Sequence, residues 1–273
     1  METFLSTDGT PIAYTREGRG PSLVLVHGTN NDHSIWASVL PALRARFTVY
    51  ALDRRGRGRS GDGEAYSIER EYEDVATLVD AVPGPVLLVG HSFGALCALG
   101  AALLVRNLGK LVLYEPPLFS VPEVTSSELV GRLEELVRTH QRERALELFL
   151  REVARMSEAQ LRLLRALPIW TLWMDAAHTL PRESRAAEGY VLEEERCSRL
   201  EVPVLLLLGG DSPPFFASAI NRLHQVLPRS RVAVLPHQGH LAMSTAPALF
   251  VRELLAHADS LPEEGPSSQG GGS

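Results

Sequence analysis

Short apolar runs recur along the chain, with helix-like segments between them. The runs that are long and apolar enough to be buried strands cover residues 22–26, 48–52, 86–89, 111–114, 203–209 and 231–235. Residues 68–81 instead carry apolar side chains three or four positions apart, which predicts an amphipathic helix that ends before Pro83. Two further short strands are predicted at 3–6 and 11–15, around an Asp-Gly turn. Strands that alternate with helices predict an α/β fold with a mostly parallel sheet.

This alternation breaks between residues 118 and 200. Helical patterns follow one another there at about 126–139, 142–155, 158–166 and 183–197, with Pro168 and Pro181 as breakers and no strand-like run. We therefore predict a core domain formed by residues 1–117 and 201–260, with a helical cap at 118–200 inserted over the sheet edge. Residues 261–273 are rich in Pro, Glu, Ser and Gly, and we predict a disordered tail or linker.

One predicted strand runs directly into a G-x-S-x-G motif. The apolar residues 86–89 precede Gly90-His91-Ser92-Phe93-Gly94, and a segment rich in Ala and Leu follows. A strand that turns at once into a helix forces the central serine into a strained backbone conformation, and only small residues two positions away let the chain pass so closely. The strain lifts the hydroxyl away from the sheet, so the pattern predicts Ser92 as a nucleophile.

Composition and charge limit which partners, cofactors and cellular locations we expect. The 273 residues carry a net charge of −6 and show no basic footprint, so we expect no nucleic-acid partner. Cys97 and Cys197 are far apart, and there is neither a metal-ligand cluster nor a Gly-rich dinucleotide fingerprint, so we predict no metal and no cofactor. The chain lacks a signal-like start and a stretch of membrane length, so we expect a cytoplasmic protein without a membrane partner. The oligomeric state stays open.

Four motifs together resemble the α/β-hydrolase fold superfamily, in particular bacterial serine esterases and lactonases, with similarity to the cofactor-free haloperoxidases at 50–60. They are His27-Gly28, the run from Asp53 to Ser60, the Ser92 pentapeptide and Gln238-Gly239-His240. The resemblance extends over residues 3–258 and implies a central parallel sheet flanked by helices, with a helical cap. The arginines of the second motif could suggest a phosphate site, but charge runs are usually exposed, and we expect a solvated turn held by Asp53.

The resemblance also implies roles for individual residues. Ser92 matches the nucleophile and His240 the general base, in preference to His237 three residues upstream. The backbone N–H groups of Thr29 and Phe93 match the oxyanion hole. His27 and Gly28 are expected to belong to the substrate site.

The acid that orients His240 has two candidates. Most relatives place it three residues past a glycine at the end of the strand at 203–209. That position is Ser212, and Asp211 lies one residue early. The other known location is the end of the strand that follows the elbow helix, which here is Glu115. We favour Glu115, and Asp211 is the alternative.

Large apolar residues of the cap bear on the substrate. Phe119, Trp170 and Trp173 could roof a pocket above Ser92, although for any single one of them packing in the core of the cap is the favoured interpretation. A roof of this kind favours an apolar or aromatic ester, thioester or lactone. The leading interpretation is a serine hydrolase of carboxylic esters that forms an acyl-enzyme. The alternatives are a perhydrolase or haloperoxidase, a C–C bond hydrolase on the same triad, or a small-molecule receptor without catalysis.

Overall fold

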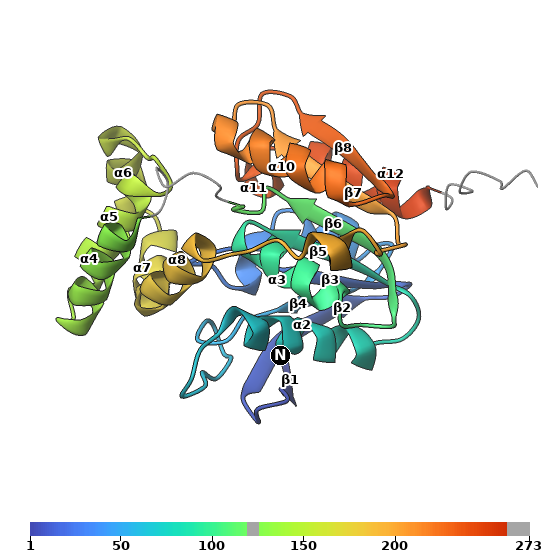
Figure 1. Cartoon of the computed structure of the whole chain (residues 1–273), viewed down its shortest axis with the longest axis horizontal. Coiled ribbons are helices and arrows are strands. Elements are labelled where there is room, and N and C mark those ends of the chain that lie inside the picture. Colours follow the sequence, from blue (N-terminus) through green and yellow to red (C-terminus); the bar gives the residue numbers. More distant parts are fainter. Residues whose placement is uncertain (119–125, 261–273) are drawn as a thin grey trace, which may run out of the picture.

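An eight-stranded sheet forms the centre of the computed structural model, which describes residues 1–118 and 126–260 (Figure 1). The strand order is β1-β2-β4-β3-β5-β6-β7-β8. Only the pairs β1–β2 and β2–β4 are antiparallel, and the other neighbours are parallel. This arrangement confirms the predicted α/β architecture. The strands are β1 (Glu2–Leu5), β2 (Pro11–Gly18), β3 (Ser22–Val26), β4 (Thr48–Leu52), β5 (Val86–His91), β6 (Leu108–Tyr114), β7 (Val204–Gly209) and β8 (Ser230–Leu235).

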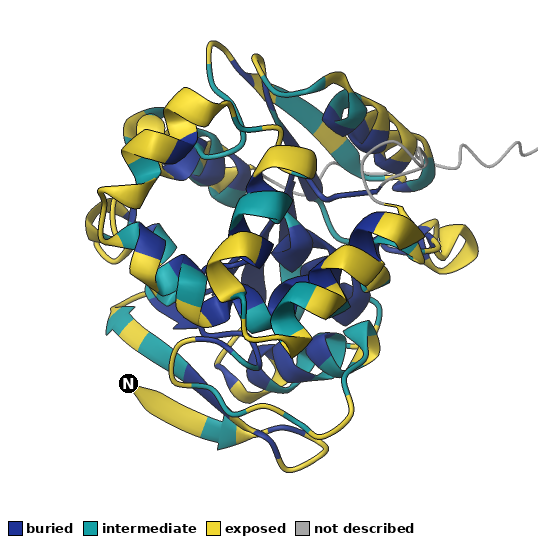
Figure 2. Cartoon of the chain, turned by 90° about the vertical axis from the view of Figure 1, so that its left-hand side faces the viewer, coloured by how far each residue is buried: buried dark blue, intermediate teal, exposed yellow. Residues whose placement is uncertain are grey.

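Helices cover both faces of the sheet because the inner strands are apolar on both sides. In β3, Val24 and Val26 pack toward one helical layer, and Leu23 and Leu25 pack toward the other. Figure 2 shows the buried central strands behind helices whose outward faces are exposed. The first layer contains α2 (Ile68–Ala81), α3 (Phe93–Ala102) and α10 (Pro214–Val226). The second contains η1 (His33–Trp36), α1 (Leu40–Leu43), α11 (Ala242–Thr245) and α12 (Pro247–Asp259).

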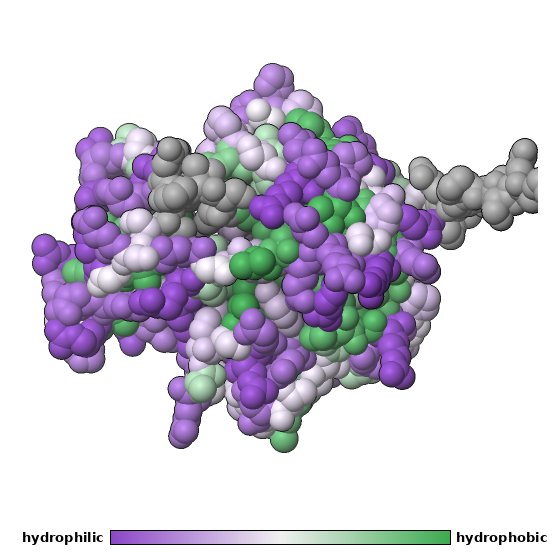
Figure 3. All heavy atoms as spheres, in the orientation of Figure 1, coloured by the Kyte–Doolittle hydropathy of each residue, from purple (hydrophilic) through white to green (hydrophobic). Residues whose placement is uncertain are grey.

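In its described residues, the chain between β6 and β7 consists of helices joined by loops, without a strand, and its helices lie to one side of the sheet (Figure 1). We call residues 126–200 the helical segment. Figure 3 shows mainly hydrophilic residues on the outer surface of its first helices. Its helices are α4 (Ser127–Arg138), α5 (Arg142–Glu152), α6 (Glu158–Arg165), α7 (Ile169–Ala176), η2 (Ala177–Thr179), α8 (Leu180–Glu188) and α9 (Glu194–Cys197). Within the described part of the chain, no helix is both long and apolar enough to span a lipid bilayer.

The predicted helices of the helical segment differ from the observed ones at two places. The helix expected over 183–197 is replaced by α8 and the separate short α9, and α7 was not expected at all. Pro181 does not interrupt a helix but occupies the first turn of α8, where its missing N–H costs no hydrogen bond. Pro168 likewise stands at the N-cap of α7. Phe119 and the predicted tail at 261–273 lie outside the described residues.

The arginine turn after β4 also differs from its prediction. Asp53 does hold the turn, because its carboxylate accepts hydrogen bonds from the backbone N–H groups of His33 and Arg59 at 2.9 Å each. Arg54, Arg55 and Arg57, however, are buried rather than solvated.

Acidic side chains from distant elements make this burial possible. Arg54 pairs with Glu71 of α2 at 2.7 Å and with Glu183 of α8, and Arg57 also pairs with Glu183. Arg55 pairs with Asp74 of α2 at 2.7 Å. These ion pairs connect the turn to both α2 and the helical segment.

Candidate active site

Ser92 occupies the sharp turn between β5 and α3. Its backbone has φ 54° and ψ −127°, a strained conformation for a residue other than glycine. A Cβ at Gly90 would lie 2.5 Å from the carbonyl oxygen of Gly94, and a Cβ at Gly94 would collide with the backbone of His27. The two glycines therefore allow the close strand-to-helix turn that places Ser92 at the head of α3.

The His240 ring is hydrogen-bonded to a fully buried carboxylate. Nδ1 of His240 lies 2.6 Å from Oε2 of Glu115, and Oε1 of Glu115 accepts the backbone N–H of Gly209 at 2.6 Å. Glu115 follows the last residue of β6 and has a left-handed backbone, φ 47°. Because the carboxylate accepts from Nδ1–H, Nε2 of His240 is left as a hydrogen-bond acceptor.

Neighbouring aromatic rings and a tyrosine hydroxyl hold the loop that carries His240. The Tyr114 hydroxyl donates to the carbonyl of Gly239, and Nε2–H of His91 donates to the carbonyl of His240 at 2.8 Å. Burial lowers the pKa of His91 well below its usual range, so the ring stays neutral. The Phe216 ring stacks on His240 with centroids 4.7 Å apart.

Sequence reasoning did not single out Tyr114 and Phe216 as parts of the site. Only their positions in the sequence could have indicated a role in the site. Tyr114 directly precedes Glu115 at a strand end, and Phe216 lies two residues into α10.

Asp211 borders the cavity that Ser92 and His240 line, but among the described residues neither Asp211 nor His237 is hydrogen-bonded to the His240 ring. Asp211 is exposed in the loop after β7, and its backbone N–H donates to the carbonyl of Gln238 at 2.9 Å. His237 is exposed as well. The carboxylate that bonds to His240 in this structure is that of Glu115.

Thr29 and Phe93 border the same cavity as Ser92 and His240. Phe93 is the first residue of α3, so its N–H has no acceptor within the helix and is available to a ligand. Thr29 lies in the loop after β3, beside the turn that carries Ser92. Backbone donors at these two positions can face an oxygen atom held near Ser92.

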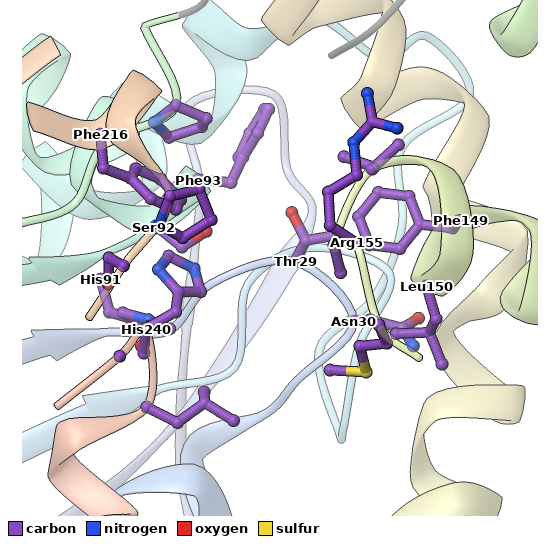
Figure 4. Close-up of a pocket in the computed structure, with 18 of the residues that line it drawn as sticks. Thr29, Asn30, His91, Ser92, Phe93, Phe149, Leu150, Arg155, Phe216 and His240 are labelled. Atoms are coloured by element: carbon purple, nitrogen blue, oxygen red, sulfur yellow. The ribbon is translucent and has the colours of Figure 1, made fainter. Parts of the chain in front are cut away.

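The cavity has a volume of about 380 Å³ and lies between the core and the helical segment. Figure 4 shows His91, Ser92 and His240 on one side, with Phe149, Leu150 and Arg155 opposite them. Trp173 of α7 also lines the cavity, and its Nε1–H donates to Oδ1 of Asn31 at 3.1 Å. The helical segment thus provides much of the wall that faces Ser92.

Three residues expected in the substrate site do not line the cavity. Trp170 belongs to the apolar core of the helical segment, under the guanidinium of Arg165. His27 is fully buried, its Nε2 accepts the backbone N–H of Arg54 at 3.0 Å, and burial lowers its pKa to about 3. Gly28 packs behind the nucleophile, where a Cβ would lie 2.8 Å from Cβ of Ser92. His27 and Gly28 therefore support the turn behind Ser92.

One trio with metal-binding side chains occurs among the described residues. Ligand atoms of Asp32, His33 and Asp53 lie within 4.8 Å of one another. Both oxygens of Asp53 accept hydrogen bonds from protein groups, and Asp32 accepts from the backbone and the hydroxyl of Ser34. The trio does not border the cavity and serves to hold the turn.

Comparisons with known proteins identify the family. A model of the alpha/beta hydrolase family matches residues 23–253. A pimeloyl-(acyl-carrier protein) methyl ester esterase from Nitrosomonas europaea is 29% identical over 246 residues, 86% of this chain and 94% of that protein. An α/β hydrolase from Sphaerobacter thermophilus has a TM-score of 0.84 and 32% identity, over 94% of this chain and 100% of that one. An esterase from Rhodococcus sp. ECU1013 has a TM-score of 0.75 and 27% identity, over 95% of this chain and 98% of that one.

The family match extends over most of the sheet and includes the turn that carries Ser92 and the loop that carries His240. The chain belongs to the α/β-hydrolase family and is a hydrolase.

Proposed function

We propose that this protein is a serine hydrolase of carboxylic esters with an apolar or aromatic part, and that Ser92, His240 and Glu115 form its catalytic triad. The observation that carries the proposal is the 2.6 Å contact between Nδ1 of His240 and the buried carboxylate of Glu115, at the edge of the cavity that Ser92 lines. A carboxylate at this ring nitrogen fixes the tautomer whose other nitrogen can take a proton from serine. The esterases among the similar proteins support a small-molecule ester as the substrate.

The acylation step follows from these positions. Oγ of Ser92 bonds to the ester carbonyl carbon while Nε2 of His240 takes the serine proton. The carbonyl π electrons move onto oxygen, and the N–H groups of Thr29 and Phe93 stabilise this oxyanion. Collapse of the tetrahedral intermediate breaks the ester C–O bond, and the imidazolium of His240 gives its proton to the departing alcohol. The product of this step is an acyl-Ser92 ester.

Deacylation repeats the sequence with water. His240 takes a proton from water as the oxygen bonds to the acyl carbon, and the oxyanion forms again at the same donors. Collapse breaks the bond to Oγ of Ser92, which recovers its proton from His240, and the carboxylic acid is released. The carboxylate of Glu115 accepts the hydrogen bond from Nδ1–H of His240 and stabilises the imidazolium at each step.

We further propose that the helical segment is a cap that selects the substrate. Phe149 and Leu150 of α5 and Trp173 of α7 present apolar side chains to the cavity opposite Ser92. A wall of this kind favours an apolar acyl or alkyl group by removing its surface from water. Thioesters and lactones present the same carbonyl carbon to Ser92 and fit the same scheme.

Labelling and hydrolysis assays test the proposal together. A fluorophosphonate should label the protein at Ser92, and p-nitrophenyl esters of graded acyl length should be hydrolysed. Ser92→Ala should remove the label and lower kcat by about 10⁴-fold or more, because no other group supplies the nucleophile. The control is Ser218→Ala, which removes an exposed hydroxyl on α10. Retained labelling in folded Ser92→Ala would refute the assignment, and saturable ester binding without turnover would favour a receptor.

A further inference from the structure

Five side chains that border the cavity have buried polar atoms without a protein partner in the described part of the chain: Asn30, His91, Glu183, Ser184 and Ser212. Nδ1 of His91 lies near Gly28, behind the nucleophile, and Ser212 is only partly buried, so these two are set apart from the other three. Asn30, Glu183 and Ser184 are each 3% exposed or less, and all three border the cavity of Ser92. Within the described residues, both amide atoms of Asn30, Oε2 of Glu183 and Oγ of Ser184 have no hydrogen-bond partner. Native proteins leave few buried polar atoms in this state, so a group of them at one cavity needs an explanation.

The carboxylate of Glu183 is firmly placed. Oε1 of Glu183 is held by the buried guanidinium groups of Arg54 and Arg57, so its carboxylate cannot turn to solvent. Arg54 in turn lies over the ring of Phe93, with 4.7 Å between its guanidinium carbon and the ring centroid. Ser184 follows Glu183 on α8. Asn30 follows Thr29 and lies on the side of the cavity away from His240 (Figure 4).

A ligand that fills the cavity displaces water from these atoms. An entirely apolar ligand would leave them without hydrogen bonds, and a buried unpaired polar group is costly. A ligand with its own donor and acceptor restores the lost bonds. The cavity therefore discriminates against a ligand that is apolar throughout, although most of its wall is apolar.

The atoms also define the chemistry of the matching group. Glu183 and the Asn30 carbonyl oxygen accept hydrogen bonds, the Asn30 amide donates, and the Ser184 hydroxyl does both. The charges of Glu71 and Glu183 balance those of Arg54 and Arg57. A carboxylate placed here would face Oε2 of Glu183 and be repelled, whereas a neutral group meets no such penalty.

We infer that Asn30, Glu183 and Ser184 form a polar subsite that binds a neutral hydrogen-bonding group of the substrate, a hydroxyl or a primary amide. The substrate then combines an ester, an apolar body and this polar group. The inference rests on the proposed function in one respect, because the ligand is the substrate only if the protein hydrolyses esters.

The test compares esters that differ only at the far end. Methyl esters of ω-hydroxy acids with four to nine carbons are matched with alkyl esters in which a methyl group replaces the hydroxyl. For each pair, kcat/KM is measured by pH-stat titration. At the chain length that reaches the subsite, the wild-type protein should prefer the hydroxy ester.

Two variants remove parts of the subsite with little change elsewhere. Ser184→Ala deletes only Oγ from α8. Asn30→Gly removes the amide side chain, and glycine adopts the φ of 62° at this position without strain. Each should lower the ratio of hydroxy to alkyl ester by about threefold to tenfold, the range for one hydrogen bond. Comparing the ratio between variants cancels the difference in hydration of the two esters. Ser212→Ala is the matched control, because it removes another unpartnered hydroxyl that borders the cavity from the loop after β7.

A binding experiment separates this inference from the proposed function. Binding of 7-hydroxyheptan-2-one and octan-2-one, neither of which can be hydrolysed and of which only the first has a hydroxyl, is followed by calorimetry on the wild type and Ser184→Ala. Tighter binding of the hydroxy ketone that disappears in Ser184→Ala supports the subsite even if no ester is turned over. Three results would overturn the inference and leave the proposed function intact. The ratio of kcat/KM for hydroxy and alkyl esters could be the same in all variants, or it could fall as much in Ser212→Ala as in Ser184→Ala. The third result is a preference for monomethyl adipate, whose far end is a carboxylate.

Discussion

Replacement of Glu115 by glutamine isolates the role of its charge. The glutamine amide has almost the same shape, and its oxygen can still accept the N–H of Gly209, which Glu115 now accepts at 2.6 Å. Its NH₂ group then faces Nδ1 of His240, where the structure has a carboxylate oxygen at 2.6 Å. An NH₂ group can only donate, so Nδ1 must accept and the ring proton moves to Nε2.

In that tautomer, His240 cannot take the proton of Ser92. We expect kcat for an activated ester to fall by about 10³- to 10⁴-fold, or about 4–5.5 kcal/mol in activation free energy. Glu115→Ala would be a poorer test, because it leaves the buried N–H of Gly209 without a partner and lowers stability as well.

The assay is steady-state hydrolysis of a p-nitrophenyl ester by folded variants, with thermal unfolding as the check on structure. Asp211→Asn is the matched control, and its exposed position predicts less than about a threefold loss. Activity within tenfold of wild type in Glu115→Gln, together with a large loss in Asp211→Asn, would transfer the role of the acid to Asp211.

Further predictions concern the helical segment and the buried arginines. Trp173→Ala should shift the preference toward longer acyl chains, whereas Trp170→Ala should keep the preference and lower the free energy of unfolding by about 3–5 kcal/mol. Arg54→Met should destabilise the protein by about 3–5 kcal/mol at pH 7, because Glu71 and Glu183 lose a buried partner. Burial raises the pKa of Glu71, but Arg54 and Arg57 lower it more strongly, from 4.5 to about 2. The wild type should therefore lose stability as the pH falls from about 5 to 2, and Arg54→Met should lose less over that range in urea titrations. Equal pH dependence in both proteins would contradict this assignment of the charges.

The sequence predicts the centre of the sheet well because β3, β4, β5 and β7 are almost entirely buried on both faces and therefore read as unbroken apolar runs. The sharp turn at Ser92 was predictable for a similar reason, since only glycine fits at positions 90 and 94. Glu115 became a candidate because it follows a strand end at the correct distance from Ser92. Each of these signals lies within one element or between two consecutive ones.

The failures arise from contacts between distant parts of the chain. Arg54 reads as part of an exposed charge run, because nothing local shows that its partners are 17 and 129 residues away. Trp170 and Trp173 are three residues apart on one helix, yet only the second borders the cavity. Which of two such side chains is available to a ligand depends on how α7 packs, and helical periodicity alone does not specify this.

The ion pairs between the core and α8 limit how the helical segment can be exchanged between relatives. A chimera that receives this segment from another protein without an acid at position 183 would bury Arg54 and Arg57 with the single carboxylate of Glu71, a net charge of +1. Such a chimera would be unstable even if its helices fitted the sheet well. Positions 54, 57, 71 and 183 therefore have to be transferred, and have to evolve, as one unit, although three belong to the core and one to the segment above it.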